Sequence, residues 1–212
     1  QDHKRVLEGD KGKNTGGMGA YSPSRLINKD LETKIINKII KPTLKGLSEL
    51  NTEYKGFLYT GLMIVDDEPY LIEYNVRMGD PECQTIIPKL KTDLLDILLA
   101  CCEEKLNETK IEWLNKKSLC IVLCSNGYPE SFKKNIEIEN LNKISSNNDE
   151  FIFHAGTEKK NDKIYAVGGR VLNFVALSDD FKKAKEAIVN NIKKLNWSGG
   201  FYRRDIGHKV IK

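Results

Sequence analysis

The sequence predicts an α+β fold in two parts, and three observations support this prediction. Two β-rich runs, FLYTGLMIV at 57–65 and YLIEYNV at 70–76, are joined by the short segment DDEP, which is typical of an antiparallel hairpin. Segments with helical apolar spacing lie on both sides of that hairpin. After Trp113 the pattern changes to short strands separated by Gly, Asn, Asp and Lys, which indicates a second unit from about residue 118. We therefore expect an antiparallel sheet with helices in residues 1–117 and a small β-rich domain in residues 118–212.

The first part contains a predicted loop and two predicted helices. Residues 9–19, GDKGKNTGGMG, are too rich in Gly, Asn and Thr for regular structure, so a loop is expected. The segment DLETKIINKII has isoleucine and leucine at helical spacing, with Asn28 or Asp30 available as N-cap. Pro42 would kink or restart this helix. A second helix, apolar on one side, is expected over residues 92–106.

The second part is predicted to consist mainly of strands. Four β-rich stretches, SLCIVLC, FIFHAGT, KIYAVGG and RVLNFVAL, alternate with turn-forming residues. They are followed by DDFKKAKEAIVNNIKKL, an amphipathic helix for which Ser178 is the expected N-cap.

Composition narrows the class of protein. The net charge of +4 is mild and the lysine pairs are scattered, which favours a solvated surface over a nucleic-acid partner. No apolar run approaches the ~20 residues that span a bilayer, and no signal peptide is recognisable, so no membrane partner is expected. Five cysteines without metal-ligand spacing indicate reduced thiols in a cytoplasmic protein. Because residue 1 is Gln1 and not Met, we expect the sequence to begin inside a longer protein.

The run YLIEYNVR carries a polar row on alternate positions. In an extended strand successive side chains point to opposite faces, which predicts one face with Tyr70, Ile72 and Tyr74 and the other with Glu73 and Asn75, continued by Arg77. Magnesium takes hard oxygen ligands and often only one or two from the protein, which Glu73 and Asn75 would supply. Arg77 would bind a phosphate or carboxylate. The alternative is a plain exposed strand.

Two neighbouring segments favour a site over that alternative. Gly79 allows a sharp turn after the polar row, and Asp80-Pro81-Glu82 adds two carboxylates on a rigid turn. So many charged groups are costly to hold together without a counter-ion or a ligand. The loop NTGGMG at 14–19 is glycine-rich, so its N–H groups could ring an anion. The alternative for this loop is a mobile surface segment.

The segments QDHKR, NTGGMGAYSP, IEYNVRMGDPE, HAGT, GGRVL and FYRRDIG resemble glycinamide ribonucleotide synthetase, also called phosphoribosylamine–glycine ligase. They follow the family's order and spacing over nearly all of the chain. The resemblance is to the C-terminal half of that enzyme: the last part of an ATP-grasp domain, followed by the small β-rich C-terminal domain. Two positions depart from the usual pattern. Met78 stands where the family usually has Phe, and Tyr59-Thr60-Gly61 lacks the acidic metal ligand that many ATP-grasp enzymes carry there.

The resemblance implies an ATP-dependent ligase of purine biosynthesis that uses Mg²⁺ or Mn²⁺. Its substrates would be ATP, glycine and 5-phosphoribosylamine, with glycyl phosphate as the intermediate and glycinamide ribonucleotide as the product. The metal site would have two protein ligands and be completed by ATP phosphates and water. The N-terminal half of the same enzyme is the implied partner. The chain alone is expected to be inactive, or active only beside a chain that supplies that half.

The resemblance also implies roles for individual residues. Glu73 and Asn75 are the implied metal ligands, and the implied catalytic residues are Arg77, Asp80 and Glu82. The implied substrate-binding residues are Asp2, Lys4, Arg5, Thr15, Gly16, Gly17 and Pro81. His154, in the HAGT segment, is expected to be structural. Two other functions remain open: a different ATP-grasp ligase or carboxylase acting on a small carboxylate, and a non-catalytic binding or scaffolding protein.

Overall fold

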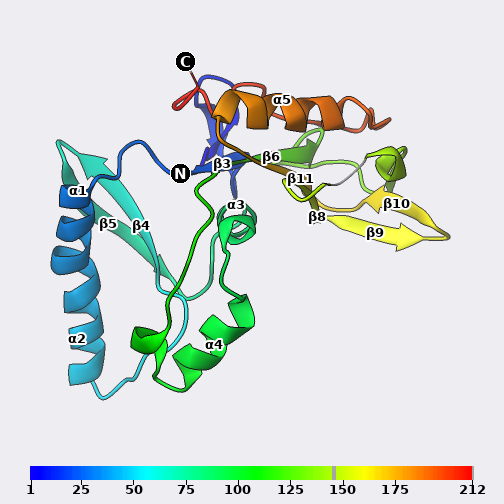
Figure 1. Cartoon of the computed structure of the whole chain (residues 1–212). Helices are drawn as coiled ribbons and strands as arrows, with labels where there is room; N and C mark the ends of the chain where they lie inside the picture. Colours follow the sequence, from blue (N-terminus) through cyan, green and yellow to red (C-terminus); the bar gives the residue numbers. More distant parts are fainter. Residues whose placement is uncertain (145–146, 212) are drawn as a thin grey trace. The chain divides into compact units, whose positions relative to one another are not determined.

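The computed structural model describes residues 1–144 and 147–211 and divides them into two compact units (Figure 1). Unit 1 comprises Gln1–Pro23, Asp80–Lys89 and Leu114–Lys212, whereas unit 2 comprises Ser24–Gly79 and Leu90–Trp113. Both units are therefore discontinuous in sequence. Among the described residues, no helix has the length and apolar character needed to cross a membrane.

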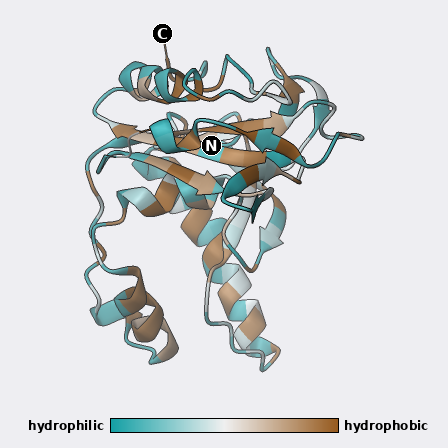
Figure 2. Cartoon of the chain, turned by 90° about the vertical axis from the view of Figure 1, so that its right-hand side faces the viewer, coloured by the Kyte–Doolittle hydropathy of each residue, from teal (hydrophilic) through white to brown (hydrophobic). Residues whose placement is uncertain are grey.

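Unit 1 is built on a five-stranded antiparallel sheet. The strands run in the order β12-β6-β11-β8, and β3 also pairs with β6. Their bounds are Gly19–Ser22 (β3), Lys117–Ser125 (β6), Glu150–His154 (β8), Arg170–Ser178 (β11) and Gly200–Phe201 (β12). β6 and β11 are apolar and buried along most of their length, and the main strands are coloured as hydrophobic in Figure 2. This burial places the core of unit 1 at the centre of the sheet.

Helices cover both faces of this sheet. Helix α5 (Phe181–Ile192) lies over one face and α3 (Glu82–Ile86) under the other, followed by the 3₁₀ turn η2 (Ile87–Lys89) (Figure 1). The N-cap of α5 is Asp180, whose carboxylate accepts from two backbone N–H groups, so the prediction of Ser178 was wrong. Ser178 lies two residues too early: its hydroxyl accepts from the N–H of Asp180 itself.

Two small sheets complete unit 1. One has the order β7-β10-β9, with bounds Ile136–Ile138 (β7), Lys163–Ala166 (β10) and Thr157–Lys160 (β9), and the 3₁₀ turn η4 (Leu141–Lys143) follows β7. The other is a hairpin of β1 (Arg5–Leu7) and β2 (Lys11–Asn14). The predicted loop over residues 9–19 was therefore wrong for β2. The turn residues Gly9 and Asp10 have positive φ, which lets Lys11–Asn14 pair with Arg5–Leu7. The segment Lys11–Asn14 contains few residues that favour strands, so its composition did not predict the pairing.

Unit 2 holds a helical segment, a hairpin and a separate helix. The helical segment runs through α1 (Lys29–Ile35), a π-helical stretch η1 (Ile36–Ile40) and α2 (Lys41–Glu49). Of the two expected N-caps, Asn28 and Asp30, it is Asn28 that caps the segment, by accepting from the N–H of Leu31. The π-helical stretch lies immediately before the turn that contains Pro42, so the helix adjusts its hydrogen bonding there instead of breaking. Helix α4 (Leu94–Cys102) and the 3₁₀ turn η3 (Leu106–Glu108) form the remainder.

The predicted hairpin is present as β4 (Tyr59–Val65) and β5 (Glu68–Asn75). Its register contains one irregularity: Gly61 pairs with Glu73, but Leu62 pairs with Leu71. Ile72 is thus an extra residue, as in a β-bulge. Residues that pair directly across two strands share a face, so the bulge shifts the alternation along β5.

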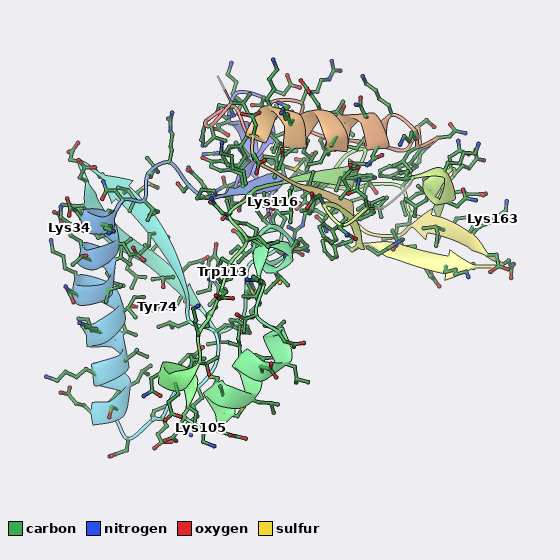
Figure 3. All side chains as sticks on the ribbon, in the orientation of Figure 1. Lys34, Tyr74, Lys105, Trp113, Lys116 and Lys163 are labelled. Carbon is green, nitrogen blue, oxygen red and sulfur yellow. The ribbon has the colours of Figure 1, made fainter. Side chains whose placement is uncertain are left out.

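This shift overturns the prediction that Tyr70, Ile72 and Tyr74 share one face. Tyr74 faces the helical segment, where its hydroxyl meets that of Thr43 (Figure 3). Beyond the bulge Leu71 takes over that face, and Tyr70 moves to the opposite one. Tyr70 and Ile72 are 56% and 64% exposed, respectively.

Candidate functional site

The polar row on β5 places Glu73 and Asn75 side by side. The side-chain amide of Asn75 donates to Oε1 of Glu73 over 3.1 Å, which confirms that both side chains point to the same face. Glu73 is exposed and Asn75 is half-buried, so both are reachable from solvent. An acid oxygen and an amide oxygen within one small region match the one or two protein ligands that Mg²⁺ usually takes. The residues present therefore fit a two-ligand metal site.

Gly61 makes room for this pair on the adjacent strand. It lies directly opposite Glu73, and a Cβ atom at Gly61 would come within 3.0 Å of Cγ of Glu73. Any side chain at Gly61, in the stretch Tyr59-Thr60-Gly61, would therefore press on Glu73.

Arg77 does not extend the polar row as a strand residue. β5 ends at Asn75, and the chain bends over the next two residues. The guanidinium of Arg77 is exposed and donates to the carbonyl oxygen of Met78 over 3.0 Å. The direction of the remaining N–H donors of Arg77 therefore depends on the bend after β5 and not on the sheet.

In unit 1 the glycine-rich loop is fixed by hydrogen bonds that its backbone N–H groups donate. The N–H of Thr15 donates to the carbonyl of Lys4 over 2.8 Å, and that of Met18 donates to the carbonyl of His3 over 2.9 Å. The N–H of Gly16 donates to the hydroxyl of Tyr128, and the N–H of Gly17 donates to Oγ1 of Thr15, each over 3.0 Å. These four amides are engaged within the protein, so an anion could reach them only by replacing one of these bonds.

Two acidic residues meet beneath this loop. A Cβ atom at Gly17 would lie 2.5 Å from Cδ of Pro81 and 3.0 Å from Oδ1 of Asp2, so only glycine fits there. The carboxylate of Asp2 is 2.5 Å from the ammonium of Lys4. Burial, reinforced by the nearby carboxyl group of Glu82, nevertheless raises the pKa of Asp2 to about 6. Asp2 and Glu82 therefore form a buried pair, and Asp2 takes up a proton more readily than an ordinary aspartate does.

Both carboxylate oxygens of Asp80 take part in fixing its turn. Oδ1 accepts from the side-chain amide of Gln84 over 3.0 Å, and Oδ2 accepts from the Arg170 guanidinium over 3.2 Å. Arg170 also donates to the Asp80 carbonyl over 2.6 Å and to the Gly16 carbonyl over 2.9 Å. Sequence reasoning did not assign a role to Arg170 or to Tyr128. The only signal was that Arg170 belongs to the GGRVL segment.

Arg5 and Thr15 stabilise the segment before the loop. The Arg5 guanidinium donates to the carbonyl of Gly12 over 2.7 Å, across the β1–β2 hairpin, and is exposed. Thr15 Oγ1 donates to the carbonyl of Lys4 over 2.8 Å. His154, at the end of β8, is exposed and its Nδ1 lies 2.8 Å from Oγ1 of Thr157. The structural role expected for His154 stays a prediction.

A second group of potential metal ligands in unit 1 is unsuited to a cation. The ligand atoms of His3, Asp10 and His208 lie within 4.8 Å of one another. However, the N–H of Gly207 donates to Nε2 of His3 over 3.2 Å, so the neutral ring carries its proton on Nδ1, the atom that faces Asp10. Asp10 is also paired with Arg203 and Lys209. The negative charge of Asp10 is therefore already neutralised by Arg203 and Lys209, which leaves little attraction for a metal ion.

Family models match both parts of the chain. The model described as phosphoribosylglycinamide synthetase, ATP-grasp (A) domain, matches residues 1–83, and the model for the C domain of the same enzyme matches residues 118–209. The chain belongs to the phosphoribosylglycinamide synthetase family. The resemblance stated from the sequence is thereby confirmed, as is the α+β fold with an ATP-grasp part.

Known relatives agree with this assignment, and this chain corresponds to their C-terminal half. The chain is 42% identical to a phosphoribosylamine–glycine ligase of Brucella melitensis over 212 residues, which is 100% of this chain and 50% of the relative. It is also 42% identical to a chloroplastic phosphoribosylamine–glycine ligase of Arabidopsis thaliana, covering 100% of this chain and 41% of that protein. The chain thus spans about half the length of the curated relatives it matches.

Solved structures show the same fold. The crystal structure of phosphoribosylamine–glycine ligase from Thermotoga maritima has a TM-score of 0.83 at 34% identity and covers 98% of this chain and 50% of its own. A biotin carboxylase domain of Hydrogenobacter thermophilus has a TM-score of 0.62 at 11% identity, covering 94% of this chain and 42% of that one. The second likeness establishes the fold alone.

Proposed function

We propose that the chain is the C-terminal half of a phosphoribosylamine–glycine ligase, in which it supplies the metal-binding edge and the loop that meets the acceptor substrates. The observation that carries this proposal is the pair of Glu73 and Asn75, which point to one face of β5 within hydrogen-bonding distance of each other. Family membership and the relatives' names support the activity. ATP, glycine and 5-phosphoribosylamine are the proposed substrates.

The proposed reaction has two steps. The γ-phosphoryl group of ATP passes to a carboxylate oxygen of glycine, giving glycyl phosphate and ADP. The amine nitrogen of phosphoribosylamine then bonds to the glycyl carbonyl carbon, inorganic phosphate leaves, and the amine loses a proton. No covalent protein intermediate is required, so the protein contributes alignment and charge neutralisation.

The chain's own residues have distinct proposed parts in these steps. Glu73 and Asn75 would hold Mg²⁺ or Mn²⁺, whose chemistry when bound is to neutralise the charge of the ATP phosphates. Arg77, exposed after β5, would bind a phosphate group. The buried Asp2–Glu82 pair, with Lys4 beside it, would bind the amino group of a substrate and hold its proton, because the pKa of Asp2 is about 6. Asp80 and Pro81 would shape the turn, and Arg5, Thr15, Gly16 and Gly17 would border the acceptor substrates.

The division of the chain into an ATP-grasp part at 1–117 and a β-rich domain at 118–212 belongs to the same proposal. The two family-model matches, over 1–83 and 118–209, support it. Strand β3 nevertheless pairs with β6, so the two sequence parts share one sheet in unit 1. A cytoplasmic location stays a prediction, and one plant relative is named chloroplastic.

Reconstitution tests this function directly. The chain would be coexpressed with the residues that precede the matched region in the Thermotoga maritima enzyme and assayed for ADP release with ATP, glycine and phosphoribosylamine. We expect ADP release that depends on all three substrates and a product with the mass of glycinamide ribonucleotide, whereas the chain alone gives none. Turnover of another carboxylate, with no use of glycine, would replace this function by that of a different ATP-grasp ligase. Lack of turnover by a complex that forms stably would contradict the proposal.

A further inference from the structure

Two glycine-containing motifs that the proposed reaction does not use pack against each other in unit 1. The HAGT segment (154–157) and the GGR segment (168–170) touch backbone to backbone. A Cβ atom at Gly156 would lie 2.6 Å from Cα of Gly168 and 2.5 Å from the carbonyl oxygen of Arg170. The N–H of Gly156 donates to that carbonyl over 2.9 Å, and the N–H of Gly168 donates to the carbonyl of Gly156 over 3.0 Å. The two motifs thus form a rigid base at the start of β11.

This base directs one aromatic side chain at the glycine-rich loop. A Cβ atom at Gly169 would lie 2.3 Å from Cδ2 of Tyr128, so the missing side chain of Gly169 leaves the space that the Tyr128 ring fills. The hydroxyl of Tyr128 then accepts from the N–H of Gly16 over 3.0 Å. Ser125 fixes the same stretch, because its N–H donates to the carbonyl of Gly169 over 2.8 Å.

The same base also directs Arg170. Its Nη1 donates to the carbonyl oxygens of Gly16 and Asp80 over 2.9 and 2.6 Å, and its Nη2 donates to Oδ2 of Asp80 over 3.2 Å. The Arg170 side chain is only 21% exposed. Gly16 permits this approach, since a Cβ atom there would lie 2.7 Å from Cζ of Arg170. One guanidinium therefore ties the glycine-rich loop to the Asp80-Pro81-Glu82 turn.

We propose that Arg170 is a positioning residue of the substrate site, and that Tyr128 assists it by fixing the N–H of Gly16. This inference rests on the proposed function for the identity of the substrates but not for the contact itself. The planar guanidinium reaches three oxygen acceptors at fixed angles, which a lysine ammonium on a flexible stem cannot reproduce. Loss of Arg170 leaves the loop and the turn each folded but less firmly held together, which displaces the substrate groups that they border.

Backbone amide hydrogen exchange tests the contact in the chain itself. Three variants, Arg170→Lys, Arg170→Met and Tyr128→Phe, would be compared with Arg204→Met, whose side chain is 85% exposed in the same unit. In both Arg170 variants we expect the Gly16 and Gly17 amides to exchange about tenfold faster, with α5 unchanged. Tyr128→Phe should accelerate the Gly16 amide but not the Gly17 amide. In a fourth variant, Arg170→Ala, added guanidinium ion should restore the slow exchange in part.

The outcomes separate a positioning role from a merely structural one. Unchanged exchange at Gly16 and Gly17 in Arg170→Met would overturn the proposal, as would equal acceleration throughout unit 1. In the reconstituted ligase we expect Arg170→Lys to raise KM for glycine or phosphoribosylamine by about tenfold while KM for ATP stays the same. If the wild-type complex has no ligase activity but the exchange results hold, the ligase function fails and the link made by Arg170 stands.

Discussion

At several positions of this chain glycine is required because a side chain opposite it fills the space of a Cβ atom, and not only because the backbone turns there. Gly61 leaves space for the Glu73 side chain, Gly17 leaves space for Pro81 and Asp2, and Gly16 leaves space for Arg170. In each case the absent Cβ atom lets a neighbouring side chain come close to the glycine backbone. Replacing Gly61 or Gly16 would therefore displace the neighbouring side chain, whereas replacing Gly17, which has a φ of +124°, would also strain the backbone.

At Gly61 this reasoning gives a specific prediction. Gly61→Ala should displace Glu73, because the new Cβ lies 3.0 Å from Cγ of Glu73, and should weaken the binding of Mn²⁺ with ATP by about tenfold. Titration monitored by the EPR signal of free Mn²⁺ measures this. The matched control is Gly46→Ala, since a Cβ at Gly46 in α2 meets no atom within 4 Å. That control should leave Mn²⁺ binding unchanged and stabilise the helix by about 0.5–1 kcal/mol. Equal Mn²⁺ affinity in Gly61→Ala and the wild type would refute the claim.

His3 gives a prediction for pH dependence. Burial, with the nearby cations Arg203 and Lys209, lowers the pKa of His3 from 6.5 to about 4. The folded state therefore favours the neutral ring, and the stability from this effect is fully present above pH 6.5 and is lost as the pH falls towards 4. Over that range the loss is about 3 kcal/mol.

His3→Gln removes the titration while its amide oxygen can still accept from Gly207. Urea unfolding of both proteins between pH 4 and 8 measures the difference in the free energy of unfolding. We expect the wild type to lose this stability on acidification relative to His3→Gln. A difference that is constant with pH would show that His3 titrates alike in the folded and unfolded states.

At the scale of elements, features with local signals were predictable and features with distant partners were not. The Asn28 cap and the β4–β5 hairpin follow from residues close in sequence. The β1–β2 hairpin was missed, and Arg203, which stabilises its turn through Asp10, lies 193 residues away. The bulge at Ile72 depends on pairing with β4 and not on the pattern within β5. Arg170 was missed because its acceptors on Gly16 and Asp80 lie 154 and 90 residues away.

The start of α5 can be tested by removing its cap. Asp180→Ala deletes the carboxylate that accepts from the N–H groups of Lys182 and Lys183, so the melting temperature should fall by about 2–4 °C. Thermal unfolding followed by circular dichroism measures the fall. The neighbouring change Asp179→Ala is the control, because Asp179 is also exposed and accepts none of these helix N–H groups. A larger effect from Ser178→Ala than from Asp180→Ala would restore Ser178 as the cap.

At the scale of the whole molecule, the two units differ in how much apolar surface they bury. Among the described residues, the buried hydrophobic side chains lie in unit 1 except for Leu31 and Ile39. The exposed large hydrophobic side chains lie in unit 2 except for Leu7. Elements with few buried apolar contacts open most easily, so β4 and β5 in unit 2 are expected to move more readily than the central sheet of unit 1. The proposed metal ligands are therefore on the adaptable unit, and the loop and turn fixed by Arg170 are on the well-packed one.

The central claim is that Glu73 and Asn75 together hold a divalent cation that carries nucleotide phosphates. Its most direct test is selective broadening of backbone NMR signals by substoichiometric Mn²⁺ in the presence of ATP. In the wild type we predict the strongest broadening at Gly61, Glu73 and Asn75, which Glu73→Gln abolishes and which Glu32→Gln, an exposed change in α1, leaves intact. Broadening that is spread over the acidic surface, or that persists unchanged in Glu73→Gln, would contradict the claim.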